Sequence, residues 1–209
     1  MADHITIVDY GVGNVASVQN MLKKAGHDAE LTSDPEAVVA ASKIILPGVG
    51  AFDRAAGILR MTGLGEAVVQ AAGSGAQVLG ICLGMQLLLE GSEEGEGQEP
   101  GLGLIPGRVV AFPSALREQG IRIPHMGWNS VTRVGDAAAL PALVDGDRFY
   151  FVHSFHAVPT DTADRFATAQ HGIEFTAMVR RGNVMGAQFH PEKSHRTGMA
   201  MLRDFAGAA

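Results

Sequence analysis

The sequence predicts an α/β fold in which helices flank a mostly parallel central sheet and the second half is rich in β-strands. Three observations predict this fold. Strand-like runs alternate with helical runs over residues 4–90, and such alternation implies parallel strand pairing. Residues 76–82 are apolar almost throughout, as a strand covered on both faces requires. Strand-like runs then predominate after residue 104.

The first half of the chain begins with a strand, a tight turn and a helix. Strand-like runs occupy residues 4–10, 27–32, 43–47 and 76–82, and helical runs occupy residues 15–25, 36–41, 51–60, 63–73 and 83–90. Asn14 and Gly26 suit the start and end of the first helix, and Ser33 or Asp34 with Pro35 suits the start of the second.

Residues 90–103 separate the two halves and hold five Glu and five Gly among fourteen positions. Such a composition forms no packed element by itself, so we expect a solvated loop. Beyond it, strand-like runs occupy residues 108–112, 148–158, 165–171, 175–181 and 184–190, and a final helix occupies residues 194–205. Because no internal repeat or linker interrupts the pattern, we expect a single domain over residues 1–209.

The charge balance argues against a nucleic acid or an anionic membrane as the partner. Acidic residues outnumber basic ones by 22 to 16, and the chain has no block of Lys or Arg. The longest apolar stretch, residues 76–89, is shorter than the roughly 20 residues that cross a bilayer, and the N-terminus lacks the pattern of a signal peptide. We therefore expect a cytoplasmic protein whose ligands are small polar molecules or other proteins.

Cysteine and histidine usage argues against disulfides and metal sites. The chain has one cysteine, so it forms no internal disulfide and has no zinc-type cysteine pair. His153 and His156 stand three residues apart and would face opposite sides of a strand, with no third ligand evident. We expect no metal and no cofactor.

The single cysteine, Cys82, follows the apolar strand directly and has Gly80 and Gly84 on either side. A sharp strand-to-helix turn crowds the backbone, so missing Cβ atoms relieve clashes while the cysteine side chain projects outward. The free N–H groups near Leu83, at the start of the helix, would face an anion. The alternative is a small buried core residue, since free cysteines are often buried and the pattern is short.

A base and an orienting acid follow in the segment QFHPEKS. In an extended segment, residues i and i+2 share a face, so His190 and Glu192 would project together while Pro191 stiffens the chain. Taken alone, this pair is an ordinary strand histidine with a surface neighbour. Beside a cysteine elbow, it supplies a base whose tautomer is fixed by a carboxylate.

The segment LPGVGAF, residues 46–52, follows the third strand. Gly48 and Gly50 flank Val49, so the peptides between them rotate at little steric cost and can aim a backbone N–H into the pocket. The interpretation is a switchable oxyanion donor. The alternative is a plain loop between strand and helix.

Together these segments resemble the class I, triad-type glutamine amidotransferases. GICLGMQ and QFHPEKS match the nucleophile and base segments of that class. IVDYGVGN, LPGVGAF, PHMGWNS, YFVHSF and GAQFHPEKS further resemble the glutaminase subunits of imidazole glycerol phosphate synthase, from residue 5 to about residue 194. The sequence departs from that pattern at Phe155, where an aromatic with a hydroxyl is more familiar.

The resemblance implies that Cys82 attacks the side-chain amide of L-glutamine, forms a glutamyl thioester and releases ammonia, after which water yields glutamate. His190 would transfer the proton, and Glu192 would orient the imidazole of His190. The N–H groups of Val49 and Leu83 would stabilise the oxyanion.

The resemblance also implies the substrate contacts. Gly48, Gln86, Glu94 and Ser154 would bind glutamine, with Glu94 on its ammonium group and Ser154 near its carboxylate. Gln86 lies one helical turn after Cys82, and a plain polar helix face is its alternative. For Ser154 the alternative is a structural hydroxyl.

A synthase partner is implied because free ammonia would be protonated and lost in water. The partner of this family is a (β/α)8 cyclase subunit, which forms a heterodimer and makes imidazole glycerol phosphate and AICAR in histidine biosynthesis. His125, Met126 and Trp128, in PHMGWN, would form the docking surface. Trp128 could equally be a core residue, although aromatic residues are enriched at interfaces.

Three other functions compete with this interpretation. An α/β-hydrolase-type enzyme shares the elbow, but there the acid precedes the histidine, whereas Glu192 follows His190. A non-catalytic interaction subunit would not need the intact set of cysteine, histidine and glutamate. A glutaminase that feeds anthranilate or vitamin B6 formation would not need PHMGWN.

Overall fold

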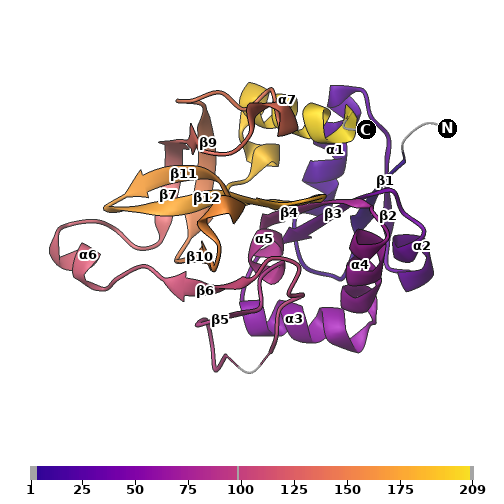
Figure 1. The fold of residues 1–209 in the computed structure, drawn as a ribbon, viewed down its shortest axis with the longest axis horizontal. Coiled ribbons are helices and arrows are strands. Elements are labelled where there is room, and N and C mark those ends of the chain that lie inside the picture. Colours follow the sequence, from indigo (N-terminus) through magenta and orange to yellow (C-terminus); the bar gives the residue numbers. More distant parts are fainter. Residues whose placement is uncertain (1–3, 98, 208–209) are drawn as a thin grey trace.

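A long mixed sheet runs through the molecule, and the computed structural model describes it within residues 4–97 and 99–207 (Figure 1). Its strand order is β2-β1-β3-β4-β13-β12-β10-β6-β5, with β11 paired to β12 and β8 paired to β11. The strands are β1 (Ile5–Val8), β2 (Ala29–Thr32), β3 (Lys43–Gly48), β4 (Gln77–Cys82), β5 (Gly91–Ser92), β6 (Gly107–Ala111), β8 (Thr132–Arg133), β10 (Phe155–Pro159), β11 (Arg165–His171), β12 (Ile173–Arg181) and β13 (Val184–Ala187).

The parallel part of the sheet comprises β2, β1, β3, β4 and β13. In the second half, β12, β11, β10 and β6 pair antiparallel. The predicted division into a mostly parallel first half and a β-rich second half is therefore confirmed. Because β13 pairs with β4 in parallel, the chain returns from the second half to lie beside the strand that ends at Cys82.

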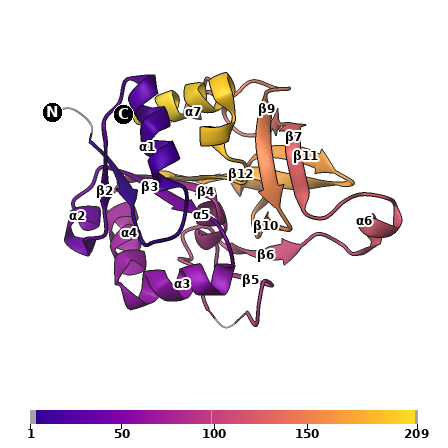
Figure 2. The same ribbon diagram turned by 180° about the vertical axis from the view of Figure 1, so that it is seen from behind.

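Helices cover both faces of the parallel strands (Figure 1, Figure 2). They are α1 (Val15–Ala25), α2 (Pro35–Val39), α3 (Phe52–Met61), α4 (Leu64–Gly73), α5 (Leu83–Leu87), α6 (Ala115–Glu118) and α7 (His195–Gly207). Helices α1 and α7 pack over one face, where Leu22, Leu202 and Ile7 belong to one buried hydrophobic cluster. Helices α2, α3 and α4 pack over the other. Each large apolar side chain that is fully buried here contributes about 1.5–3 kcal/mol.

The helix boundaries follow the expected caps in part. Gly26 ends α1 in the left-handed region at φ 93°, and the Asp34 carboxylate accepts from the N–H of Glu36 at the start of α2. Asn14 occupies the N-cap position of α1, but its side chain makes no cap hydrogen bond. Its backbone carbonyl alone begins the helix, so the capping role expected for its side chain is wrong.

The acidic segment after α5 is more ordered than its composition indicates. Gly91 and Ser92 are buried and pair in parallel with β6 as strand β5. The N–H of Gly107 donates to Glu90 Oε2 at 2.9 Å, and the N–H of Phe52 donates to Glu94 Oε2 at 2.9 Å. The expected solvated loop is therefore wrong for these residues, because backbone donors from β6 and α3 hold the carboxylates.

A second, two-stranded sheet pairs β7 (His125–Ser130) antiparallel with β9 (Arg148–His153). No strand was expected over 125–130. The sheet is joined to the parallel part through a bridge between Tyr150 and His190, whose N–H donates to the Tyr150 carbonyl at 2.9 Å. Strand β9 and the segment after β13 are thereby held side by side.

None of the described helices is both long and apolar enough to cross a lipid bilayer.

The contact between α5 and the sheet gives a testable stability prediction. A Cβ on Gly84 would overlap the Leu46 carbonyl oxygen, so Gly84→Ala forces α5 away from β3 and lowers the free energy of unfolding by roughly 3 kcal/mol. Gly73→Ala is the matched control, because a Cβ there meets nothing within 4 Å and the helical glycine gains about 0.5–1 kcal/mol. Urea unfolding measures both, and equal stabilities would contradict the close packing.

Candidate functional site

Cys82 sits on a sharp elbow between β4 and α5. Its backbone has φ 55° and ψ −110°, a conformation rarely adopted by residues other than glycine, which costs about 1–3 kcal/mol. A Cβ on Gly80 would lie 2.6 Å from the Gly84 carbonyl oxygen. The two glycines therefore let α5 fold back on β4, and Cys82 is presented at the bend as the sequence indicated.

His190 and Glu192 form the closest ion pair near the elbow. His190 Nδ1 lies 2.8 Å from Glu192 Oε1, and both side chains are only 2% exposed. The reason given from the sequence was wrong, because Glu192 lies in a 3₁₀ turn, η3 (Pro191–Lys193), rather than in an extended segment. The Ser194 hydroxyl fixes the turn by donating to the His190 carbonyl at 2.6 Å.

A pocket of about 370 Å³ opens beside the elbow, and most of the predicted site residues line it. Cys82, His190, Leu83, Val49, Gln86, Glu94 and Ser154 all line this pocket. Gly48 and Glu192 stand behind it, Gly48 at the end of β3 opposite Cys82 and Glu192 behind His190. The structure thus brings together residues from β3, β4 and α5, from the segments after β5 and β9, and from η3 with the residue before it.

Electrostatics favour a charged imidazole in this pocket. Burial lowers the pKa of His190, but the neighbouring Cys82 sulfur and the Glu192 carboxylate outweigh it and raise the pKa to about 9. The Nδ1 proton is directed at Glu192, while Nε2 makes no formed hydrogen bond to any described residue. Because His190 Nε2 is buried without a hydrogen-bond partner among the described residues, it is available to a reacting group.

The loop after β3 differs from expectation at one of its glycines. Gly50 has φ 94°, whereas Gly48 is packed, because a Cβ there would lie 2.8 Å from the Gly84 nitrogen and 2.8 Å from the Tyr10 hydroxyl. A Cβ on Gly50 would meet none of the described atoms within 4 Å, so the loop is closely packed on the Gly48 side of Val49 and open on the Gly50 side. Val49 itself is 42% exposed at the pocket.

Two further residues shape the site and were missed from the sequence. The Tyr10 hydroxyl donates to the Pro47 carbonyl at 2.8 Å and so anchors the loop that carries Val49. Gln188, which is fully buried on the segment leading to His190, donates from Nε2 to Cys82 Sγ at 3.9 Å. Neither was flagged because a tyrosine or a glutamine on an apolar strand has no distinctive spacing.

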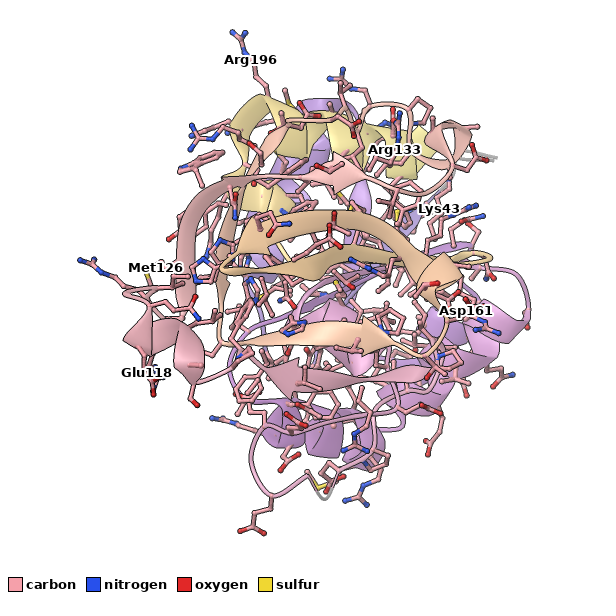
Figure 3. The ribbon with its side chains drawn as sticks, turned by 60° about the vertical axis from the view of Figure 1, so that its left-hand side comes forward. Lys43, Glu118, Met126, Arg133, Asp161 and Arg196 are labelled. Carbon is pink, nitrogen blue, oxygen red and sulfur yellow. The ribbon has the colours of Figure 1, made fainter. Side chains whose placement is uncertain are left out.

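The predicted docking residues alternate along β7. Met126 is 63% exposed and projects from the edge of the molecule, and Trp128 is 39% exposed and stacks on His195 (Figure 3). His125 points the other way and is 4% exposed. The period of two along a strand excludes His125 from the outer face, so its expected place on the docking surface is corrected.

Histidines gather beneath β7 without forming a metal site. Within residues 4–97 and 99–207, no group of three or more His, Cys, Asp or Glu side chains is arranged to hold a metal ion. His153 and His156 instead make hydrogen bonds to backbone carbonyl oxygens.

Comparison with known proteins agrees with this geometry. The family model for class I glutamine amidotransferases matches residues 6–208. Solved structures share the fold: a glutamine amidotransferase gives a TM-score of 0.74 at 19% identity, covering 97% of this chain and 98% of the other. PurLQS from Thermotoga maritima also gives 0.74, at 20% identity and 98% of each chain. The expected class I amidotransferase fold is confirmed.

Curated relatives match along almost the entire chain. The imidazole glycerol phosphate synthase subunit HisH of Syntrophotalea carbinolica is 47% identical over 203 residues, covering 96% of this chain and 98% of the relative. HisH of Moorella thermoacetica is 46% identical, covering 96% of this chain and 93% of the relative. The chain therefore belongs to the class I glutamine amidotransferase family, and within it to the HisH subunits of imidazole glycerol phosphate synthase.

Proposed function

We propose that this chain hydrolyses L-glutamine to glutamate and ammonia through a thioester on Cys82. The observation that carries the proposal is the placement of Cys82 and of His190, which is paired with Glu192, around one pocket. The ammonia serves the cyclase subunit that completes imidazole glycerol phosphate synthase in histidine biosynthesis. The HisH relatives and the family model support this assignment.

His190 acts as the proton carrier. At neutral pH its raised pKa keeps it as an imidazolium, which holds the proton taken from the thiol. The Cys82 sulfur attacks the amide carbon of glutamine, and the C–N bond breaks as Nε2 delivers its proton to the departing ammonia. The neutral imidazole then takes a proton from water as that water attacks the thioester carbon. The C–S bond breaks, glutamate leaves, and the Cys82 sulfur and the His190 imidazolium return to their starting state.

Two backbone N–H groups stabilise the oxyanion in this mechanism. The N–H of Leu83 lies at the start of α5, and that of Val49 comes from the loop after β3. A donor of this kind is worth about 3–4 kcal/mol of transition-state stabilisation in other acyl-transfer enzymes. Gly48 supports both donors, because its packing against Leu83 and Gly84 sets the distance between them.

The substrate is held at both of its ends. Glu94 receives the ammonium group of glutamine, and its carboxylate is already fixed by the N–H of Phe52. Ser154, which lines the same pocket, receives the carboxylate of glutamine with its hydroxyl and backbone. Both Nε2 hydrogens of Gln86 are engaged by Phe155 and Gln188, so its Oε1 is the atom that meets the substrate.

The partner is a (β/α)8 cyclase subunit that docks on the outer face of β7 and forms a heterodimer. Met126 and Trp128 present exposed apolar surface there, next to the pocket wall at Pro124. Ammonia released at Cys82 passes to that partner instead of to bulk water. Because the nucleophile must remain a free thiol, we place the reaction in a reducing compartment, the cytoplasm.

The activity itself is tested by following glutamate production from glutamine with the cyclase partner present. We expect Cys82→Ala to lower the rate by about a thousandfold or more, because the nucleophile is lost. Gly73→Ala, at the end of α4 just before β4 begins and so at the other end of that strand from Cys82, keeps the full rate. Glutamate production by the Cys82→Ala variant at the wild-type rate would refute the proposal.

The His190–Glu192 pair gives a pH-dependent prediction. Its folded pKa of about 9 lies above the ordinary 6.5, so its stabilisation is full below pH 6.5 and is lost as pH rises through about 9. Glu192→Gln should therefore destabilise the chain more at pH 6 than at pH 10 in urea unfolding. Glu118→Gln, at the exposed end of α6, serves as the control. Equal losses of unfolding free energy at the two pH values would show that His190 is not charged beside Glu192.

The docking surface is tested with two matched methionine variants. Met126→Ala should weaken binding of the cyclase by about tenfold, because a central apolar contact is lost. Met61→Ala removes a methionine at the end of α3 that is 75% exposed, more than Met126, and should leave binding unchanged. Calorimetry or surface binding measures both constants, and equal effects would place the interface elsewhere.

A further inference from the structure

A line of polar groups, most of them buried, connects the docking strand β7 with the Cys82 sulfur. It starts at Asn129 on β7 and ends at Gln188 beside Cys82. Resting on the proposed function, we propose that His125, His153 and Gln188 are positioning residues for glutamine hydrolysis. They belong to a hydrogen-bond network in which every donor and acceptor is fixed, and this network holds the pocket wall and the nucleophile in register with β7.

The donor and acceptor atoms are identified first at the β7 end of the network. Asn129 Nδ2 donates to the Gln170 carbonyl at 2.7 Å, and Asn129 Oδ1 accepts from the N–H of Ser130 at 2.8 Å. These two bonds settle which end of the amide is nitrogen. The same nitrogen lies 3.1 Å from His125 Nε2, so Nε2 is an acceptor and carries no proton.

The two imidazoles must then share one tautomer. His125 Nδ1 lies 2.9 Å from His153 Nε2, and His153 Nδ1 lies 2.8 Å from the Phe155 carbonyl oxygen. A carbonyl only accepts, so His153 carries its proton on Nδ1 and accepts on Nε2. His125 must donate from Nδ1, which is the tautomer that Asn129 requires from the other end. Two independent constraints therefore give the same answer.

Both imidazoles are neutral in this arrangement, because a second proton would remove an acceptor from the chain. Burial agrees with that state. Burial and the neighbouring His171 lower the pKa of His125 to about 4, and burial lowers the pKa of His153 to about 3. The two rings therefore transmit position rather than charge at neutral pH.

The chain continues from the Phe155 carbonyl to the sulfur. That oxygen also accepts from Gln86 Nε2 at 3.2 Å, and the second hydrogen of the same nitrogen is directed at Gln188 Oε1, 3.1 Å away. Because Gln188 accepts through its oxygen, its nitrogen faces Cys82 Sγ at 3.9 Å as a donor. Every side chain between β7 and the sulfur thus has one permitted orientation.

The position of this chain makes it a part of the site rather than of the core alone. His153, Ser154 and Phe155 form one wall of the glutamine pocket, and the chain bonds to that wall from behind. Gln188 contacts the Cys82 sulfur itself. A shift of β7 on docking would therefore be felt at both the substrate wall and the nucleophile.

The first test needs no variant. In the chain labelled with ¹⁵N histidine, long-range ¹H–¹⁵N correlation at pH 7 should show His125 and His153 as neutral rings protonated on Nδ1. The eight histidines are assigned through single His→Gln variants. A proton on Nε2 of either ring, or an imidazolium at pH 7, would overturn the proposal.

Coupling along the chain is tested with two charge variants on β7. Asn129→Asp replaces the first donor by an acceptor of the same shape, so His125 should move its proton to Nε2. Ser130→Asp adds the same charge at the next, exposed position and should leave both tautomers unchanged. Unchanged tautomers in the Asn129→Asp variant would break the first link.

The sulfur end is tested by alkylation, because Cys82 is the only cysteine. Gln188→Met keeps the side-chain length but loses the donor, so iodoacetamide should react with Cys82 about tenfold more slowly. Gln70→Met, at an exposed position on α4, is the matched control, and unfolding midpoints confirm that both variants fold. An unchanged rate in the folded Gln188→Met variant would remove Gln188 from the site. Neither readout uses glutamine, so these results stand apart from the test of the proposed hydrolysis.

Discussion

The structure depends on the close approach of α5 to the ends of β3 and β4. The backbones pack so closely at Gly80 and Gly84 that no side chain fits between the helix and the strands. Gly48 likewise packs against α5, so the loop that follows β3 lies against the same helix. This contact forces Cys82 into its rare backbone conformation and aims it at the pocket. The same contact brings Leu83 and Val49 to the pocket that Cys82 lines, where we propose that their N–H groups stabilise the oxyanion.

The second half of the chain supplies the histidine that the elbow around Cys82 lacks. Strand β13 pairs in parallel with β4 and leads directly into His190, while β9 fixes His190 through Tyr150. Sheet pairing therefore brings the His190 imidazole to the pocket that Cys82 lines, although more than a hundred residues separate the two in the sequence. The small sheet of β7 and β9 then connects this centre to the outer surface where Met126 and Trp128 lie.

The sequence predicted the parallel core and the pocket residues well, because apolar strands, Gly spacing and the segments around Cys82 and His190 are local signals. The predictions from sequence failed where tertiary contacts determine the local structure. The carboxylates of residues 90–94 are held by donors from β6 and α3, which no local pattern reveals. His125 points inward because residues 125–130 form a strand, which the sequence did not predict. Gln188 contacts Cys82 only because the fold brings their two segments together. Asn14 shows that the right residue at a cap need not use its side chain.

The central claim is that the Cys82 sulfur becomes covalently bound to the carbonyl carbon of glutamine. The most direct measurement is an acid quench of the complex during turnover, followed by mass spectrometry of the peptide that contains Cys82. The account predicts a glutamyl adduct on that peptide, formed and lost at rates that match glutamate production. Steady glutamate production without any adduct on Cys82, or with the adduct on another residue, would contradict it.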